Sequence, residues 1–81
     1  MSKEEILKRV QDIFIDVLQN ENIVLNYNTT PDDIEGWDSL NNILLILEIE
    51  KEFNFKFKLE EILSFKNIGG MCNNILIKIR D

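Results

Sequence analysis

The residues of this chain best suited to chemistry form the run Gly36-Trp37-Asp38-Ser39-Leu40, which opens a long apolar segment. Aspartate is a preferred N-cap residue, so Asp38 followed by Ser39 predicts a helix that begins at the serine. A serine at that position is exposed, and the free N–H groups and positive dipole end of the helix favour an anion attached there. The run is therefore compatible with a phosphodiester on Ser39, although spacing alone favours two ordinary capping residues.

The composition argues against catalysis by Ser39 itself. A Gly-Asp-Ser-Leu hydrolase needs glycine immediately before the aspartate, where this chain has Trp37, and a histidine, which the chain lacks. A serine without a neighbouring base is a poor nucleophile. A calcium loop with Gly36 at its sixth position would need carboxylates where Pro31 and Asn42 stand. We therefore expect neither an enzyme nor a metal site.

The negative charge is concentrated in the middle of the chain. The 81 residues carry a net charge of −6, and residues 32–61 hold nine acidic side chains against three basic ones. This distribution argues against nucleic acids and anionic membranes as partners, and it favours a basic protein. The N-terminus shows no apolar leader, and no run approaches the roughly 18 apolar residues of a membrane span. We expect a cytoplasmic monomer without membrane insertion.

The first half of the chain predicts one long helix followed by a long loop. The helix is expected from about Ser2 to Asn20, with Ser2 and Glu5 at the spacing of a capping box. The loop is expected from about 21 to 37 and contains a short helical turn that Thr30 caps. Its apolar side chains are expected to anchor it on the helices: Ile23, Val24, Leu25 and Ile34.

The second half predicts two further long helices and a short one. The second helix is expected from Ser39 to Phe53, and the last from Ile68 to Ile79 after Asn67 as its cap. Residues 55–59 form an extended connector, and residues 59–63 add a short helix. Cys72, the only cysteine, falls on the apolar stripe of the last helix and is expected to be a packed thiol. The whole chain, 1–81, is thus predicted to be a single all-α domain.

The second helix carries two apolar stripes, although one would be enough to pack it on a bundle. We expect the first stripe to build the core: Leu45, Ile46, Ile49 and Phe53. The second stripe has i, i+3, i+4, i+7 spacing and is expected to remain partly exposed for docking: Leu40, Ile43, Leu44 and Leu47.

The stretch from Asp33 to Phe53 resembles the signature of acyl carrier proteins, in which Asp-Ser-Leu opens the second helix and an acidic residue with Phe closes it. The similarity continues from Phe65 to Met71, where Asn67 replaces the family's threonine. Helix order, loop length and chain length also resemble the family. The resemblance therefore covers nearly the whole chain and implies a bundle of three long helices and one short helix, with a long loop after the first.

The resemblance also implies a function. A 4'-phosphopantetheinyl transferase would attach 4'-phosphopantetheine from coenzyme A to Ser39, with Asp38 helping the transferase to recognise the site. The thiol of the arm would then carry acyl groups as thioesters. The implied partners are an acyl-loading ligase or synthase and acyltransferases or other pathway enzymes. They would dock on the second helix through Leu40, Ile43, Leu44, Leu47, Glu48 and Lys51.

Two positions depart from the family pattern. Leu44 stands where many fatty-acid carriers have glutamate, and Lys51 replaces a commonly acidic residue. We therefore expect an apolar docking face on which Leu44 is the most exposed side chain. Such a face favours a specialised carrier of secondary metabolite or surface-glycan synthesis over a housekeeping fatty-acid carrier. An aminoacyl or peptidyl carrier and an unmodified acidic interaction module remain alternatives, and the cargo is not identified.

Overall fold

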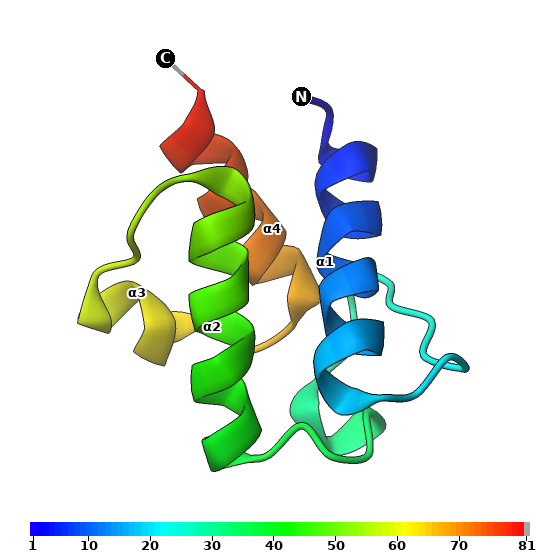
Figure 1. Cartoon of the computed structure of the whole chain (residues 1–81). Coiled ribbons are helices and arrows are strands. Elements are labelled where there is room, and N and C mark those ends of the chain that lie inside the picture. The colour runs from blue at the N-terminus through cyan, green and yellow to red at the C-terminus, as the bar shows by residue number, and fades with distance from the viewer. Residues whose placement is uncertain (81) are drawn as a thin grey trace.

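The computed structural model describes residues 1–80, which form an all-helical bundle (Figure 1). Its elements are α1 (Lys3–Leu18), the 3-10 turn η1 (Pro31–Asp33), α2 (Ser39–Phe53), α3 (Leu59–Ser64) and α4 (Ile68–Ile79). The predicted fold of three long helices and one short helix is confirmed. Within these residues there is no strand, so the connector before α3 is extended but unpaired. No helix among them has the length and apolar character that a membrane crossing requires.

The ends of α1 show which local signals decide helix boundaries. The side chain of Ser2 accepts a hydrogen bond from the N–H of Glu5, and the Glu5 carboxylate accepts one from the N–H of Ser2, as predicted. The helix ends two residues before the expected Asn20. Gln19 adopts the left-handed conformation, with φ of 54°, and its N–H closes the last turn on the carbonyl of Ile15.

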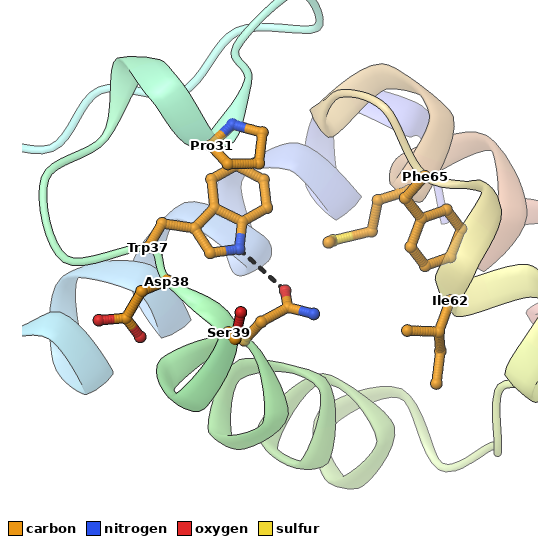
Figure 2. Close-up of a pocket in the computed structure, with 8 residues that line it drawn as sticks. Pro31, Trp37, Asp38, Ser39, Ile62 and Phe65 are labelled. Atoms are coloured by element: carbon orange, nitrogen blue, oxygen red, sulfur yellow. Dashed lines mark hydrogen bonds between the residues drawn. The ribbon is translucent and has the colours of Figure 1, made fainter.

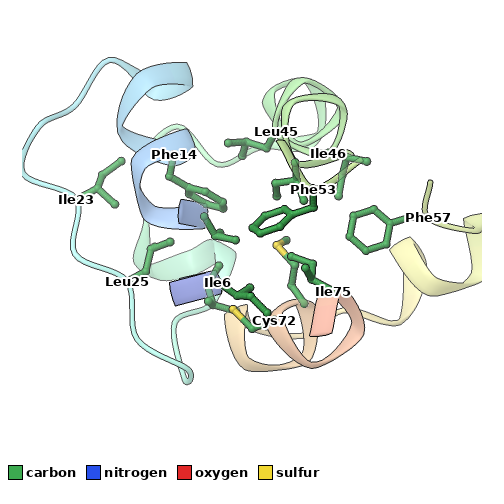
Figure 3. Packing of buried hydrophobic residues seen from close by; sticks show 14 residues of the cluster. Ile6, Phe14, Ile23, Leu25, Leu45, Ile46, Phe53, Phe57, Cys72 and Ile75 are labelled. Atoms are coloured by element: carbon green, nitrogen blue, oxygen red, sulfur yellow. The ribbon is translucent and has the colours of Figure 1, made fainter. Parts of the chain in front are cut away.

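The core lies where α1, α2 and α4 meet (Figure 3). The predicted core stripe of α2 is confirmed, because all four of its side chains are buried. They pack with the buried faces of α1 and α4, and this apolar burial is the main force that holds the bundle together. The fully buried side chains include Ile6, Val10, Phe14, Leu45, Ile49, Ile68, Cys72 and Ile75.

The loop between α1 and α2 is fixed to the bundle by backbone hydrogen bonds. The N–H of Leu25 donates to the side chain of Gln11 in α1 at 3.0 Å. At the start of α4, the N–H of Gly69 donates to the carbonyl of Tyr27 at 2.8 Å, and the N–H of Ile68 donates to that of Thr29 at 2.9 Å. Val24, expected as an anchor, is 74% exposed; that expectation is wrong.

α3 packs on the core through partly buried apolar side chains, Ile62 and the flanking Phe65, and an ion pair ties it to α4. None of its residues is fully buried. Glu61 bonds the Lys78 ammonium at 2.9 Å, and its carboxylate also accepts the N–H of Lys58 at 2.7 Å. The backbone donor at Lys58 is the largest of the influences that lower the pKa of Glu61. This side of the bundle therefore depends less on apolar packing than the α1–α2–α4 core does.

Candidate functional site

The start of α2 is built by its capping residues. The Asp38 carboxylate accepts the N–H of Asn41 at 2.8 Å, and the Asp38 carbonyl accepts the N–H of Asn42 at 2.8 Å. The Asn41 side chain donates to the carbonyl of Gly36 at 2.8 Å. Gly36 has φ of +90°, a backbone conformation that glycine adopts without strain, and it turns the loop into the helix. These contacts fix the start of α2 at Ser39, as predicted.

Ser39 lies exposed at the first position of α2. Asp38 accepts the N–H groups of Asn41 and Asn42. The N–H groups of Ser39 and Leu40, the first two of α2, have no acceptor within the helix. Those free donors and the positive dipole end favour a phosphate ester on the serine. An exposed hydroxyl at this place thus fits a covalently attached phosphopantetheine.

A pocket of about 310 Å³ lies directly beside Ser39. Figure 2 shows Pro31 and Trp37 facing Ile62 and Phe65 across it. The nearly fully buried side chain of Met71, from α4, also lines it. The pocket thus gathers apolar side chains from four segments next to the predicted attachment residue, and it is large enough for part of an acyl chain.

Trp37 is held in the pocket wall by two contacts. Its ring packs edge-on against Phe14 of α1, with 4.9 Å between the ring centroids. Its indole N–H donates to the side-chain oxygen of Asn42 at 2.8 Å. The sequence did not reveal this pair or the pocket, because the residues lie on segments that only the tertiary fold brings together. The presence of a lone tryptophan before Asp38-Ser39 was the one available signal.

The predicted docking stripe is exposed along one side of α2. Leu40 is 72% exposed, Ile43 58%, Leu47 50% and Leu44 47%. The expectation that Leu44 is the most exposed of the four is wrong. Leu44 lies in the middle of the stripe with Leu40 and Leu47 one turn away on either side, whereas Leu40 stands in the first turn and has such a neighbour on one side only.

The two charged residues predicted for the docking face lie beside the stripe. The Lys51 ammonium approaches the Glu48 carboxylate at 3.8 Å, one turn apart on α2. Glu48 is half-buried and Lys51 is exposed. Their opposite charges offset one another, so the face is dominated by its leucine and isoleucine side chains.

Cys72 is a packed thiol, as predicted. Its side chain is fully buried in α4. Burial in apolar surroundings raises the pKa of the thiol to about 11. At neutral pH the group is therefore protonated and inaccessible, so Cys72 does not compete with a phosphopantetheine thiol for acyl groups.

The fold and the site together define a class: a small helical carrier with an exposed serine at the start of its second helix. Residues 8–75 match the family described as phosphopantetheine attachment site. An acyl carrier protein of Cyanidium caldarium is 34% identical over 83 residues, which cover 100% of this chain and 94% of that protein.

Solved structures agree with this class. The holo acyl carrier protein from Geobacter metallireducens, solved in solution by NMR, superposes with a TM-score of 0.84 at 34% identity, covering 90% of this chain and 84% of that chain. A putative acyl carrier protein from Mycobacterium tuberculosis shares the fold, with a TM-score of 0.79 at 21% identity over 89% of this chain and 96% of that one. The chain belongs to the acyl carrier protein family, and its cofactor is covalently attached 4'-phosphopantetheine.

Proposed function

We propose that Ser39 is the attachment residue and that the chain is a substrate of a 4'-phosphopantetheinyl transferase. The observation that carries this proposal is the position of Ser39: exposed, first in α2 after the Asp38 cap, and at the edge of the apolar pocket. Of the other two serines, Ser2 is the N-cap of α1 and Ser64 is the last residue of α3, so neither stands at the first position of a helix.

The attachment is a phosphoryl transfer to the Ser39 hydroxyl. The serine oxygen bonds to the phosphorus on the pantetheine side of the coenzyme A pyrophosphate, and the bond from that phosphorus to the bridging oxygen breaks. Adenosine 3',5'-bisphosphate leaves, and the hydroxyl proton passes to a base of the transferase. When attached, the arm supplies a thiol that holds acyl groups as thioesters. The chain itself positions the serine: Asp38 fixes the helix start, and the helix N-terminus stabilises the phosphate.

The exposed stripe of α2 is proposed to bind the pathway enzymes. These are the acyl-loading ligase or synthase and the acyltransferases or other enzymes that use the cargo. Fully burying an exposed leucine contributes roughly 1.5–3 kcal/mol. Leu44 and Leu47 are already half-buried, so each would contribute about half of that against a partner. The stripe also starts next to Ser39, so an enzyme docked on it would lie beside the arm. Leu40, Ile43, Leu44, Leu47, Glu48 and Lys51 make up this proposed docking face.

We further propose that the pathway is a specialised one. The charges of Glu48 and Lys51 offset each other at 3.8 Å, and the stripe is apolar. Binding by such a face depends mainly on apolar burial. Its affinity for the native partner should then change little between low and moderate salt, unlike an interface dominated by opposite charges.

Attachment is tested by incubating the protein with coenzyme A and a broad-specificity transferase and measuring the intact mass. The wild-type chain should gain one phosphopantetheine, and Ser39→Ala should gain none. Ser64→Ala is the matched control, because Ser64 is an exposed serine at the end of α3 and its loss should leave loading unchanged. A wild-type protein that stays unmodified would instead favour an unmodified interaction module.

A further inference from the structure

Asn42 lines the pocket beside Ser39, and a hydrogen bond from Trp37 fixes the orientation of its side chain. An indole N–H can only donate a hydrogen bond, so the Asn42 atom 2.8 Å from the Trp37 nitrogen is the amide oxygen. The Asn42 amide nitrogen therefore lies on the other side of the carboxamide. Within residues 1–80 it has no hydrogen-bond partner, and Asn42 lines the pocket.

The Trp37 ring that bonds this carboxamide is itself held in place by packing. Trp37 packs edge-on against the buried ring of Phe14, with 87° between the ring planes. If the Asn42 amide were rotated, its NH₂ group would lie opposite the Trp37 N–H. Two donors cannot bond each other, so the hydrogen bond would be lost. The Trp37–Asn42 pair thus keeps a fixed hydrogen-bond donor at the pocket, one helical turn from Ser39.

This donor makes the pocket discriminate between chains. A plain alkyl chain that fills the pocket strips water from the amide N–H groups and offers no acceptor in return, which is unfavourable. A chain with a hydroxyl or carbonyl oxygen can accept that hydrogen bond. The thioester is at the far end of the phosphopantetheine arm, so the arm must fold back toward α2 for the cargo to enter this pocket. If the chain then enters past Ser39 with its tail toward Met71, the part of the cargo beside Asn42 is the part nearest the thioester, and the oxygen must lie there.

We propose that Asn42, oriented by Trp37, is a specificity-determining residue that favours acyl cargo bearing an oxygen close to the thioester over plain alkyl cargo. The inference rests on the proposed attachment to Ser39. The pocket volume of about 310 Å³ equals roughly ten water volumes, so the cargo portion it takes is short, on the order of eight carbons.

Two acceptors could bind the Asn42 NH₂ group: an oxygen of the cargo or an amide carbonyl of the phosphopantetheine arm. The experiment separates them. Protein labelled with ¹⁵N is prepared as the holo form, the octanoyl form and the 3-hydroxyoctanoyl form, each loaded from the corresponding coenzyme A derivative. The side-chain NH₂ signals of Asn42 should move in the 3-hydroxyoctanoyl form and stay close to their holo positions in the octanoyl form.

A second readout measures retention of the cargo. The rate at which hydroxylamine cleaves the thioester should fall about fivefold more for 3-hydroxyoctanoyl than for octanoyl cargo, the factor expected of one ordinary hydrogen bond. Asn42→Leu should abolish this difference. Asn42→Asp keeps an acceptor for Trp37 while removing the donor, and it should abolish the difference as well. Asn73→Leu, on the exposed side of α4, is the matched control and should retain it.

Each result decides between the possibilities. A similar movement of the Asn42 signals in all three forms would assign the donor to the arm and overturn the proposal, and so would equal protection of both cargoes in the wild type. Intact mass monitors loading throughout. A wild-type protein that takes up no group refutes attachment itself, whereas a loaded protein without discrimination refutes only the role of Asn42.

Discussion

Replacing Gly69 with alanine tests how the long loop is fixed on the bundle. A Cβ atom at Gly69 would lie 2.8 Å from the Tyr27 carbonyl oxygen and 3.2 Å from the Tyr27 Cβ. Real Cβ atoms do not approach a backbone oxygen that closely, and a backbone atom cannot swing aside as a side-chain end can. The same carbonyl accepts the Gly69 N–H at 2.8 Å, so the shift that relieves the clash also weakens this hydrogen bond.

The expected change in the free energy of unfolding combines two destabilising effects and one stabilising effect. Overpacking typically costs about 1–3 kcal/mol, and a weakened hydrogen bond costs about 0.5–1.5 kcal/mol. Against these stands the better helix propensity of alanine, up to about 1 kcal/mol. We expect Gly69→Ala to lower the free energy of unfolding by about 1–3 kcal/mol, which for a domain of this size lowers Tm by roughly 4–8 °C for each kcal/mol.

Gly70→Ala is the matched control, because it makes the same substitution in the next residue of α4. The nearest atom to its Cβ is the Asn67 side-chain oxygen at 3.6 Å, an ordinary contact. The control should therefore raise stability by up to about 1 kcal/mol. Urea denaturation followed by far-UV circular dichroism measures both variants. Equal stabilisation by the two alanines would refute the close approach of Tyr27 to α4.

Three further predictions concern the faces, the thiol and the charge of the bundle. Leu44→Glu should leave stability nearly unchanged and weaken binding of the native partner, whereas Leu45→Ala should cost about 2–5 kcal/mol; unfolding by Leu44→Glu would contradict the division into two faces. Burial raises the pKa of Cys72 to about 11, above the roughly 8.5 of an unfolded thiol, so the thiol ionises first in the unfolded state. The free energy of unfolding should therefore fall between about pH 8.5 and 11, and it should fall more steeply in wild type than in Cys72→Ala. Parallel pH profiles would contradict it. Added salt or millimolar divalent cations should raise Tm by screening the nine acidic residues of 32–61, and a constant Tm would show that their repulsion does not limit stability.

Helix starts were predictable from the sequence because capping is local chemistry. Asp38 accepts the N–H three residues on, and Asn67 accepts that of Gly70 at 2.9 Å. The core stripe of α2 was predictable for a similar reason, since helical periodicity alone places its four residues on one side. The end of α1 was less predictable, because Gln19 is not a residue that commonly takes the left-handed conformation.

The parts of the site that the sequence did not reveal depend on contacts between distant segments. Trp37 meets Phe14 across 23 positions of sequence, and Phe65 reaches the pocket from beyond α3. The relative exposure of Leu44 and Leu40 likewise depends on neighbours along the stripe rather than on residue type. Periodicity identifies the face of a helix, whereas the pocket and the degree of exposure arise only when the helices pack.

The most direct test of the central claim is to locate the modification within the chain. Trypsin cleaves after Arg9 and Lys51, and the peptide 10–51 between them contains Ser39 as its only serine. After co-expression with a phosphopantetheinyl transferase, tandem mass spectrometry of this peptide should place one phosphopantetheine on Ser39. A modification found on Thr30 or outside the peptide, or a fully unmodified peptide after confirmed transferase activity, would contradict Ser39 as the residue that carries the acyl group.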